Sequence, residues 1–557
     1  MSEHDQAKVK VPEMTIRTIV LSIILSGILG VLNVYSGALT GVYWGGSVVA
    51  AVLGYAILSI GKNRPTILEG NIVQTISSAG GVAPVGIFNA YVAAMLLGMA
   101  FDFMTAVIVL TLGSVMGVLY VVVFRRALIV EEQLAFPAGI ACAETLKVCD
   151  ESGEEASKRA KLLAITAVIA AVVVLVRDQL HLIPFYIDFT KYLPEGFVFN
   201  IAIYPLMVAL GYIIGIRPAI MFFVGGAVMW WVIGPVGFHM GVFPNPQVDP
   251  GPLKTWVTSP AVGLILGGSL MPMILKYKTF VRAFKTLANI KAVKEEKDVP
   301  LKYVLWGGGI VGALACIYYF VAFEVPVVIT IASLVLIFFA IFVLTRCVGE
   351  TGLNPGTLIG WATLGIIAAI GLKDPIKILL VGAFMMTASG LATDVMQDLK
   401  TGYLVGATPR TQIIGQFIGI LPGLLTGVFA AYVIIGAHGI GSPQAPFPMG
   451  FAWKGVAESL AGGGSVIDYV PLLIAAVIGA VSTFFALPTL TAGIAMFLPI
   501  GAAVAMLLGG LARLYVRKKY GSEAEEKHLS TASGLMVGEG FAAMIVSIIV
   551  FIKTMGA

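Results

Sequence analysis

The chain has 557 residues, of which 58% are hydrophobic and only 12% are charged, and its formal net charge is +5. A soluble globular domain carries about a quarter of its residues as Asp, Glu, Lys or Arg, so this composition excludes an ordinary soluble protein. Many uncharged runs reach the ~20 residues that a helix needs to cross a bilayer, which predicts an all-α polytopic membrane protein.

Residues 1–20 carry mixed charge and lack a small-residue cleavage site, so we expect the first hydrophobic run to be retained. Hydrophobic runs of the first half lie at roughly 15–36, 41–61, 70–97, 103–124, 160–177, 198–216, 218–238 and 259–275. Basic residues flank these runs at Lys62, Arg64, Arg125, Arg126, Lys158, Arg159, Lys161 and throughout 276–302. Because basic loops tend to stay in the cytoplasm, this pattern predicts the cytoplasmic (inner) membrane and cytoplasmic termini. The basic loop residues have this explanation, so no nucleic-acid partner is expected.

Polar residues mark the third run, in the stretch GNIVQTISSAGG. Asn71, Gln74 and Ser78 lie at positions i, i+3 and i+7, so they share one face of a helix. Gly80, Gly81 and Pro84 are expected to interrupt that helix within the membrane, where a broken helix offers backbone groups and a dipole to a peptide-like ligand. We predict substrate contacts from Asn71, Gln74, Thr75 and Ser78. The alternative is that these side chains only hydrogen-bond neighbouring helices.

The stretch LIVEEQLAFPAGIACAETL, residues 128–146, is apolar but lies between basic clusters. Both of its ends should therefore be cytoplasmic, and Pro137 and Gly139 break it in the middle. We interpret it as a re-entrant hairpin, which is tolerated at membrane depth where it is buried or lines an aqueous cavity. Glu131 and Glu132 are candidates for proton coupling, with an ordinary position in water at the membrane interface as the alternative.

A second series of runs lies at roughly 303–323, 325–346, 355–372, 376–393, 411–435, 469–487, 490–512 and 531–553. The segments 204–215 and 469–480 resemble each other, as do 221–235 and 496–510. This similarity predicts about 16 transmembrane helices in two parallel tandem repeats of eight spans each, residues 1–300 and 301–557. The charges of 513–527 would then lie outside, against the rule that places the other basic loops.

The stretch DVMQDLKTGYLVGATPR, residues 394–410, follows the fourth span of the second repeat, as 128–146 does in the first. We therefore predict a second re-entrant hairpin there. Asp394, Gln397 and Asp398 would share a helix face, and two carboxylates one turn apart in a low-dielectric place cannot both ionise cheaply. That suits proton handling by Asp394 and Asp398. The alternative is that Asp398 pairs with Lys400 or Arg410 to hold the loop closed.

Other polar residues in apolar surroundings complete the candidate site. Glu350 and Asn354 precede a run near 355 and are predicted, with Gln397 and Lys400, to contact substrate. Glu539 lies between glycines in the last span, where a lone acid either finds a partner on another helix or stays protonated, so it is a fifth candidate for proton coupling. The four cysteines are scattered and the histidines lack metal-ligand spacing, so no metal site is expected.

Six segments resemble, in order and spacing, the motifs of the oligopeptide transporter (OPT) family. They are residues 33–57, 71–81, 125–144, 397–416, 493–500 and 533–540. The segment 125–144 has the basic pair, the acidic residue and the FPxG pattern of that family. The chain is most similar to prokaryotic members, which are related to the yellow-stripe-like branch that moves metal chelates.

The resemblance implies a secondary active transporter driven by a proton gradient, with no bound cofactor. Its substrates would be small oligopeptides or, as the alternative, peptide-like metal chelates of the iron–siderophore or nicotianamine type, in which metal is only part of the cargo. A homodimer is possible for such a protein. An intramembrane enzyme lacks support because no HExxH or GxGD motif is present. A channel is also less well supported, because a large chain of two halves with broken helices is more typical of a transporter that works by alternating access.

Overall fold

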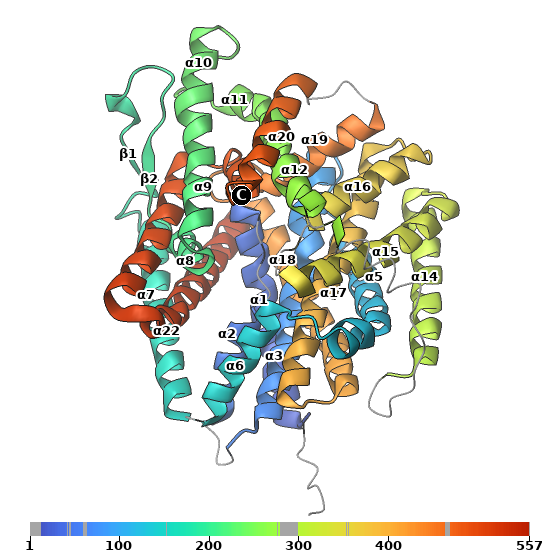
Figure 1. Ribbon diagram of the computed structural model, residues 1–557. Coiled ribbons are helices and arrows are strands. Elements are labelled where there is room, and N and C mark those ends of the chain that lie inside the picture. The colour runs from blue at the N-terminus through green and yellow to red at the C-terminus, as the bar shows by residue number, and fades with distance from the viewer. Residues whose placement is uncertain are drawn as a thin grey trace, which may run out of the picture.

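The computed structural model describes residues 13–41, 43, 46–59, 64–151, 153–275, 277–278, 299–351, 354, 356–462 and 468–555. This part of the chain is almost entirely helical, which confirms the predicted class (Figure 1). It also contains one short antiparallel pair of strands, β1 (Tyr186–Asp188) and β2 (Asn200–Ala202), which the sequence did not predict. The basic linker 276–302 lies mostly outside the described residues.

A central bundle surrounds one long helix, α17 (Pro375–Val405), whose most apolar stretch is completely buried. Its neighbours include α3 (Ile67–Val82), α5 (Phe103–Arg125) and α18 (Pro409–His438), and α1 (Ile16–Thr40) packs against α3 and α18. The chain leaves α3 through η1 (Ala83–Gly86), η2 (Ile87–Tyr91) and α4 (Val92–Leu96), and it leaves α5 through η3 (Arg126–Glu131). The shorter helices α2 (Ser47–Ser59) and α6 (Pro137–Glu151) cover the lower end of the bundle in Figure 1.

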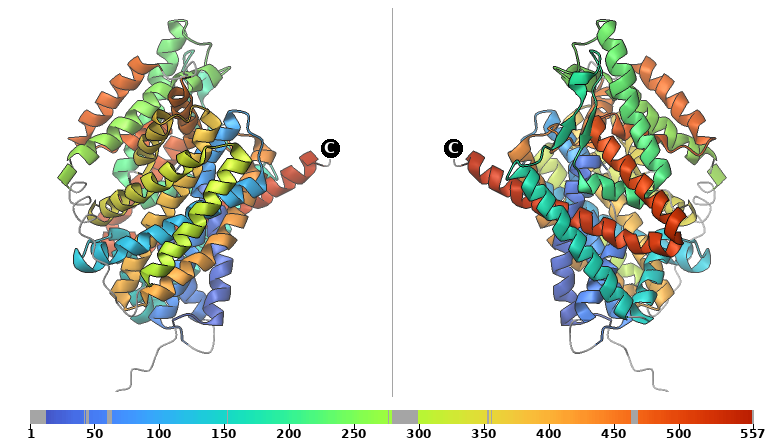
Figure 2. Two further views of the ribbon diagram at one scale, coloured as in Figure 1. Left: turned by 90° about the vertical axis from the view of Figure 1, so that its right-hand side faces the viewer. Right: turned by 90° about the vertical axis from the view of Figure 1, so that its left-hand side faces the viewer.

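A second group of helices lies to the left in Figure 1. It consists of α7 (Gly153–Asp178), η4 (Thr190–Tyr192), α8 (Pro205–Ile214), α9 (Ile216–Ala227), η5 (Val228–Ile233), α10 (Gly234–His239) and α22 (Ile500–Met555). The longest of them, α22, packs along α7 and α8, and its C-terminal end projects from the body of the molecule (Figure 2).

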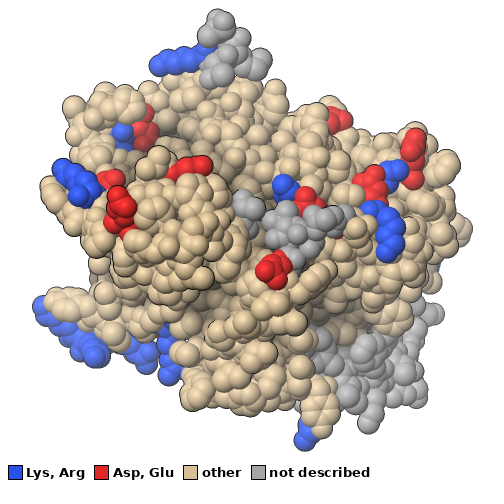
Figure 3. All heavy atoms as spheres, turned by 90° about the horizontal axis from the view of Figure 1, so that it is seen from above, with Lys and Arg blue, Asp and Glu red and all other residues tan. Residues whose placement is uncertain are grey.

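The remaining helices cover the top and the right side of the bundle in Figure 1. They are α11 (Gly251–Trp256), α12 (Thr258–Leu275), α14 (Leu301–Phe323), α15 (Val327–Thr351), α16 (Gly356–Ala369), α19 (Pro448–Ala461), α20 (Tyr469–Thr483) and α21 (Thr489–Ala495). From above, charged side chains form small separate groups on a surface that is otherwise uncharged (Figure 3). Such a surface is typical of a protein that meets lipid.

Within the described residues, nine helices are long and apolar enough to cross a membrane, and four more apolar helices are shorter. The polytopic class is therefore supported, whereas the sixteen spans and the two repeats stay predictions. Two predicted spans are wrong as continuous helices. The run at 198–216 contains strand β2 and the ten-residue helix α8, and the run at 490–512 is interrupted between α21 and α22.

The predicted re-entrant hairpin at 394–410 is also wrong. Residues up to Val405 are the last turns of α17, which ends at Gly406 in a left-handed conformation, and α18 begins at Pro409. The expected loop at 513–527 is helical as well, apart from a kink at Gly521. In both places, helix-forming polar residues extend an apolar helix. By contrast, 128–146 does contain a break, at residues 132–136, where Gln133 and Phe136 have positive φ.

Small residues let the helices α1, α3 and α18 approach one another closely. A Cβ atom on Gly423 would lie 2.1 Å from the carbonyl oxygen of Gly80, and one on Gly419 would lie 1.9 Å from the carbonyl oxygen of Ile76. Side chains cannot be accommodated at such crossings, which are common where membrane helices pack through van der Waals contact. Gly80 therefore serves packing. The chain stays helical from Ile67 to Leu96, although the regular α-helix ends at Val82 and continues through the 3₁₀ turn η1, which contains Pro84, and the π-helical turn η2.

The substitution Gly423→Ala should destabilise the protein because α3 and α18 must separate to admit the methyl group. We expect a loss of about 1–3 kcal/mol, the usual cost of overpacking, measured as a lower melting temperature in detergent. The control is Gly308→Ala on α14, where a Cβ meets no atom within 4 Å. Equal melting temperatures for Gly423→Ala and the wild type would contradict the close approach of these two helices.

Candidate functional site

The side chain of Asp398 is the centre of a buried hydrogen-bond network. Its Oδ2 atom accepts bonds from the Ser78 hydroxyl at 2.6 Å and from Gln416 Nε2 at 2.8 Å. Its Oδ1 atom accepts bonds from Gln74 Nε2 and, at 3.3 Å, from the Ser47 hydroxyl. The donors come from α2, α3 and α18, so a single carboxylate on α17 joins three other helices.

Asp394 lies one turn before Asp398 on the same buried face of α17. One of its carboxylate oxygens, Oδ2, is buried and has no hydrogen-bond partner among the described residues. The two carboxyl groups are therefore neighbours at i and i+4, the spacing at which side chains on a helix meet. No lysine or arginine in the described part of the chain forms an ion pair with either of them. The site holds two acids and neutral donors only.

The alternative in which Asp398 pairs with Lys400 or Arg410 is therefore wrong. Arg410 is exposed in the first turn of α18. Lys400 is on the buried side of α17, but its ammonium group lies 5.6 Å from the centre of the Tyr403 ring. Because the segment is helical rather than looped, residues two positions apart point in different directions from the axis, and Lys400 cannot reach the Asp398 carboxylate.

Asp394 also borders a cavity of about 300 Å³. Polar groups around this Asp394 cavity include Asn354, Thr393 and Gln397. The Asn354 amide donates to the Tyr43 hydroxyl at 3.0 Å and to the Thr393 hydroxyl at 3.2 Å. Two predicted substrate residues, Asn354 and Gln397, thus share a cavity with a predicted proton-coupling residue. The side chain of Glu350 lies outside the described residues.

The predicted substrate residues of α3 have a different place. Asn71, Gln74, Thr75 and Ser78 are fully buried. Gln412 Nε2 donates to the Asn71 side chain at 3.1 Å and lies 3.4 Å from the Thr75 hydroxyl, and Asn71 Nδ2 donates to Gln74 Oε1 at 3.3 Å. None of the four borders the Asp394 cavity. The structure thus gives these side chains interhelical hydrogen bonds, as in the alternative interpretation.

The first turn of α6, which follows the break at residues 132–136, also packs against α17. The Thr401 hydroxyl donates to the carbonyl oxygen of Gly139 at 2.9 Å, and a Cβ on Gly139 would lie 2.5 Å from the carbonyl oxygen of Gln397. The two glutamates before the break form ion pairs instead of facing the aspartates. Glu131 pairs with Arg126 at 2.9 Å, and Glu132 accepts from Arg346 Nη1 at 2.7 Å. These contacts anchor the break to its surroundings.

Glu539, the last of the five predicted proton-coupling residues, has a partner on another helix. Its completely buried carboxylate lies 3.3 Å from Arg177 Nη1 and also accepts a bond from the backbone amide of Leu206. Arg177 additionally bonds both oxygens of Asp178, at 2.6 and 2.7 Å. The arginine neutralises one carboxylate, so this second buried acidic site has a cation that the Asp394–Asp398 pair lacks.

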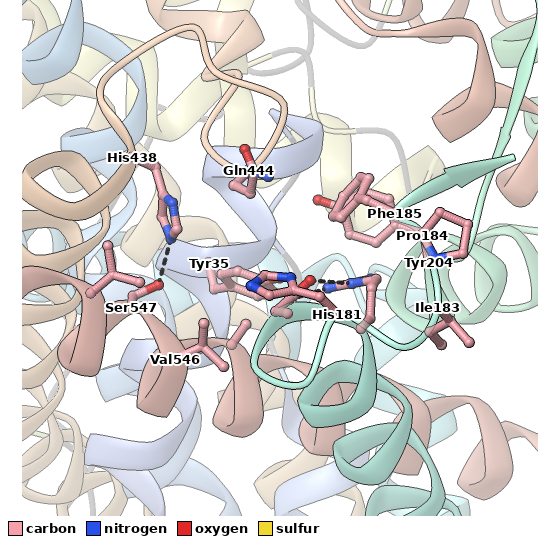
Figure 4. A pocket seen from close by; sticks show the side chains of 14 residues that line it. Tyr35, His181, Ile183, Pro184, Phe185, Tyr204, His438, Gln444, Val546 and Ser547 are labelled. Atoms are coloured by element: carbon pink, nitrogen blue, oxygen red, sulfur yellow. Dashed lines mark hydrogen bonds and ion pairs between the residues drawn. The ribbon is translucent and has the colours of Figure 1, made fainter. Parts of the chain in front are cut away.

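A cavity of about 340 Å³ lies beside Arg177, where the central bundle meets α7 and α22. Figure 4 shows Tyr35, His181 and Tyr204 around it, and His438 pointing to Ser547, whose hydroxyl is 3.0 Å from the ring nitrogen. Arg177 was not predicted from the sequence, because an arginine at the end of a hydrophobic run resembles an interfacial residue.

Three partners of Asp398 were also not predicted from the sequence: Ser47, Gln412 and Gln416. The two glutamines are four residues apart, so they lie on one face of α18 and both meet Asp398, whose carbonyl oxygen accepts from Gln412 at 2.9 Å. A search for polar pairs at this spacing inside apolar runs would have found them. Ser47 offers no comparable signal, since a single serine is common in a membrane helix.

Comparisons with known proteins cover nearly the whole chain. A family model described as OPT oligopeptide transporter protein matches residues 13–550. A Haemophilus influenzae protein, whose name provisionally describes it as an oligopeptide transporter, is 26% identical over 601 aligned positions, which cover 93% of this chain and 92% of that protein. The iron–phytosiderophore transporter yellow stripe 1 of Zea mays is 28% identical over 223 positions, 37% of this chain and 33% of that protein.

The substitution Arg177→Met should destabilise the protein strongly, because it leaves the buried carboxylate of Glu539 and the half-buried carboxylate of Asp178 without their cation. Removing one partner of a buried ion pair costs about 3–5 kcal/mol, which should appear as a large fall in melting temperature. Arg217→Met is the control, since Arg217 is exposed. If both variants melted at the wild-type temperature, the Arg177 ion pairs would contribute nothing to the fold.

Proposed function

The chain belongs to the OPT oligopeptide transporter family, and on that premise we propose that it carries small oligopeptides across the cytoplasmic membrane by proton-coupled symport. Members of this family are transporters and not enzymes. The observation that carries the proposal is the unpartnered carboxylate oxygen of Asp394, which lies beside a cavity and one turn from the fully hydrogen-bonded Asp398. Both termini would be cytoplasmic, and transport would proceed by alternating access.

The charge of the aspartate pair supports proton coupling. Two buried carboxylates without a cation repel each other and pay the cost of leaving water. A proton shared by the pair removes that cost, whereas Asp178 and Glu539 obtain the same relief from Arg177. Intramembrane acids in this situation are typical of proton relays in transporters. We therefore assign coupling to Asp394 and Asp398 rather than to Glu539.

The position of Asp398 links its protonation to helix packing. An ionised carboxylate only accepts hydrogen bonds, but a protonated one is also a donor and loses acceptor capacity. Four donors on α2, α3 and α18 meet this carboxylate, so adding a proton must weaken or rearrange at least one contact. A change of protonation at Asp398 would therefore bias how these helices pack around α17.

The chemistry of the Asp394 cavity suits a small peptide. A free carboxylate can bind the ammonium group of a peptide, while the amide and hydroxyl groups of Asn354, Gln397 and Thr393 can bond its backbone. The volume of about 300 Å³ is at the lower end of small-molecule sites. An ammonium group at Asp394 keeps that carboxylate ionised and leaves the proton of the pair on Asp398, so peptide and proton can be bound together, as symport requires.

A peptide-like metal chelate is the second candidate substrate. The observation that favours it is the similarity to relatives named as metal–nicotianamine and iron–phytosiderophore transporters, over about a third of this chain. Chelators of this kind also carry ammonium and carboxylate groups, so the same cavity could receive them. The metal would then travel as part of the chelate and not as a resident cofactor.

Replacing Asp394 or Asp398 by asparagine should abolish uptake driven by a proton gradient in liposomes, because an amide cannot take up and release the proton. Exchange of labelled trialanine across the membrane without a gradient should continue in the Asp398→Asn variant, because Asp398 does not border the cavity. The control is Asp374→Asn at the start of α17, where asparagine caps a helix as well as aspartate does.

Gradient-driven uptake at the wild-type rate in both variants would remove these residues from the coupling mechanism. The same liposomes distinguish the two substrate classes. If the wild type accumulates ferric nicotianamine and not trialanine, the chelate is the substrate and the peptide proposal fails.

A further inference from the structure

A second cavity of about 350 Å³ contains the charged side chains of Lys254, Lys454 and Glu458. Lys254 belongs to α11, and the other two residues lie one turn apart on α19. The rings of Phe451 and Phe497 add an apolar wall. We call it the lysine cavity. Neither the proposed coupling mechanism nor the substrate contacts at Asp394 use any of these residues.

The charges in the lysine cavity lack protein partners. Among the described residues, no carboxylate forms an ion pair with Lys254 or Lys454, and one oxygen of Glu458 is buried without a hydrogen bond. Burial lowers the pKa of Lys254, because its ammonium group is partly removed from water. A ligand that brought a carboxylate between the two lysines would offset this cost. The two lysines outnumber the single carboxylate of Glu458, so the cavity carries a net positive charge that favours a negatively charged group between the lysines.

The lysine cavity and the Asp394 cavity lie along the same three segments. On α12 the first is bordered by Thr258 and the second by Ile265. On α19 the corresponding residues are Lys454 and Met449, and around the end of α21 they are Phe497 and Ile494. Because α12 packs against both α19 and α21, the two cavities follow one another along a single line between these helices.

The separation of the two cavities can be estimated from helix geometry. Seven residues of α12 rise about 10 Å at ~1.5 Å per residue. An extended peptide spans roughly 3.3–3.6 Å per residue, so about three residues cover the same distance. One end of this line carries two ammonium groups and the carboxylate of Glu458, a net positive charge, and the other carries the carboxylate of Asp394.

We infer that the two cavities form one bipolar site for a short zwitterionic peptide, with its carboxyl terminus between Lys254 and Lys454 and its amino terminus at Asp394. The inference rests on the proposed function and adds the orientation and length of the substrate. Opposite charges at a fixed separation discriminate against peptides with blocked ends, because a half-buried lysine or the buried aspartate then stays unpaired. Tripeptides match the spacing best.

The test compares the affinities of trialanine, trialanine amide and N-acetyl-trialanine for the purified full-length protein. The wild type should bind trialanine at least about tenfold more tightly than either blocked peptide, since each block removes one charge-assisted contact. In Lys254→Gln and Lys454→Gln the preference over the amide should fall below about twofold, while the preference over the acetylated peptide persists. Asp394→Asn should show the reverse pattern, and the exposed Lys191→Gln should behave as the wild type.

Two results would overturn the inference. If both lysine variants keep the wild-type preference for trialanine over its amide, the lysine cavity does not receive the carboxyl terminus, while peptide binding itself stands. If the wild type binds none of the three peptides, the proposed peptide function fails and the bipolar site falls with it. Two separate lysine variants are used so that poor folding of one does not decide the outcome.

Discussion

The site depends on a carboxylate that is buried without a cation. Asp398 sits inside the most enclosed helix of the protein and is held by neutral donors from α2, α3 and α18. Each donor stabilises the charge a little, and together they replace part of the water that the group has lost. The adjacent Asp394 adds a second negative charge and receives almost none of this support. Adding a proton to this pair therefore changes the local charge balance and hydrogen bonding more than adding one to an acid that has an arginine partner.

Most other acidic residues near the helices are compensated. Arg177 neutralises Glu539, Arg346 holds Glu132, and Arg17 Nε donates to Glu69 at 2.9 Å. These pairs fasten α22 to α7, the break after η3 to α15, and α3 to α1. The presence or absence of an arginine partner distinguishes acidic residues that looked alike in the sequence. The acids with arginine partners stabilise the fold. Of the two without them, Asp394 borders the cavity and Asp398 joins the helices that would have to move in the proposed mechanism.

The sequence predicted the all-α membrane class, the family and the position of the aspartate pair in residues 394–410, because hydrophobic run length and motif order are local properties. It did not predict the geometry around that stretch. Residues 394–405 looked like a loop because charged residues usually end a membrane span, yet they continue α17, since the surrounding helices supply donors to Asp398. Likewise, Gly80 looked like a helix break but provides close packing with α1 and α18, and the Gly81 carbonyl accepts a hydrogen bond from Asn33 on α1. Partners from distant parts of the chain, such as Gln74 and Arg177, decide such cases.

The most direct test of the central claim is the number of protons exchanged when substrate binds. It can be measured by titration calorimetry of the purified protein with trialanine, near neutral pH, in buffers that differ in ionisation enthalpy. If Asp394 and Asp398 share the coupling proton, the wild type should exchange about one proton per bound peptide, and Asp398→Asn should exchange nearly none while still binding. An unchanged proton number in that variant would show that the coupling proton resides elsewhere.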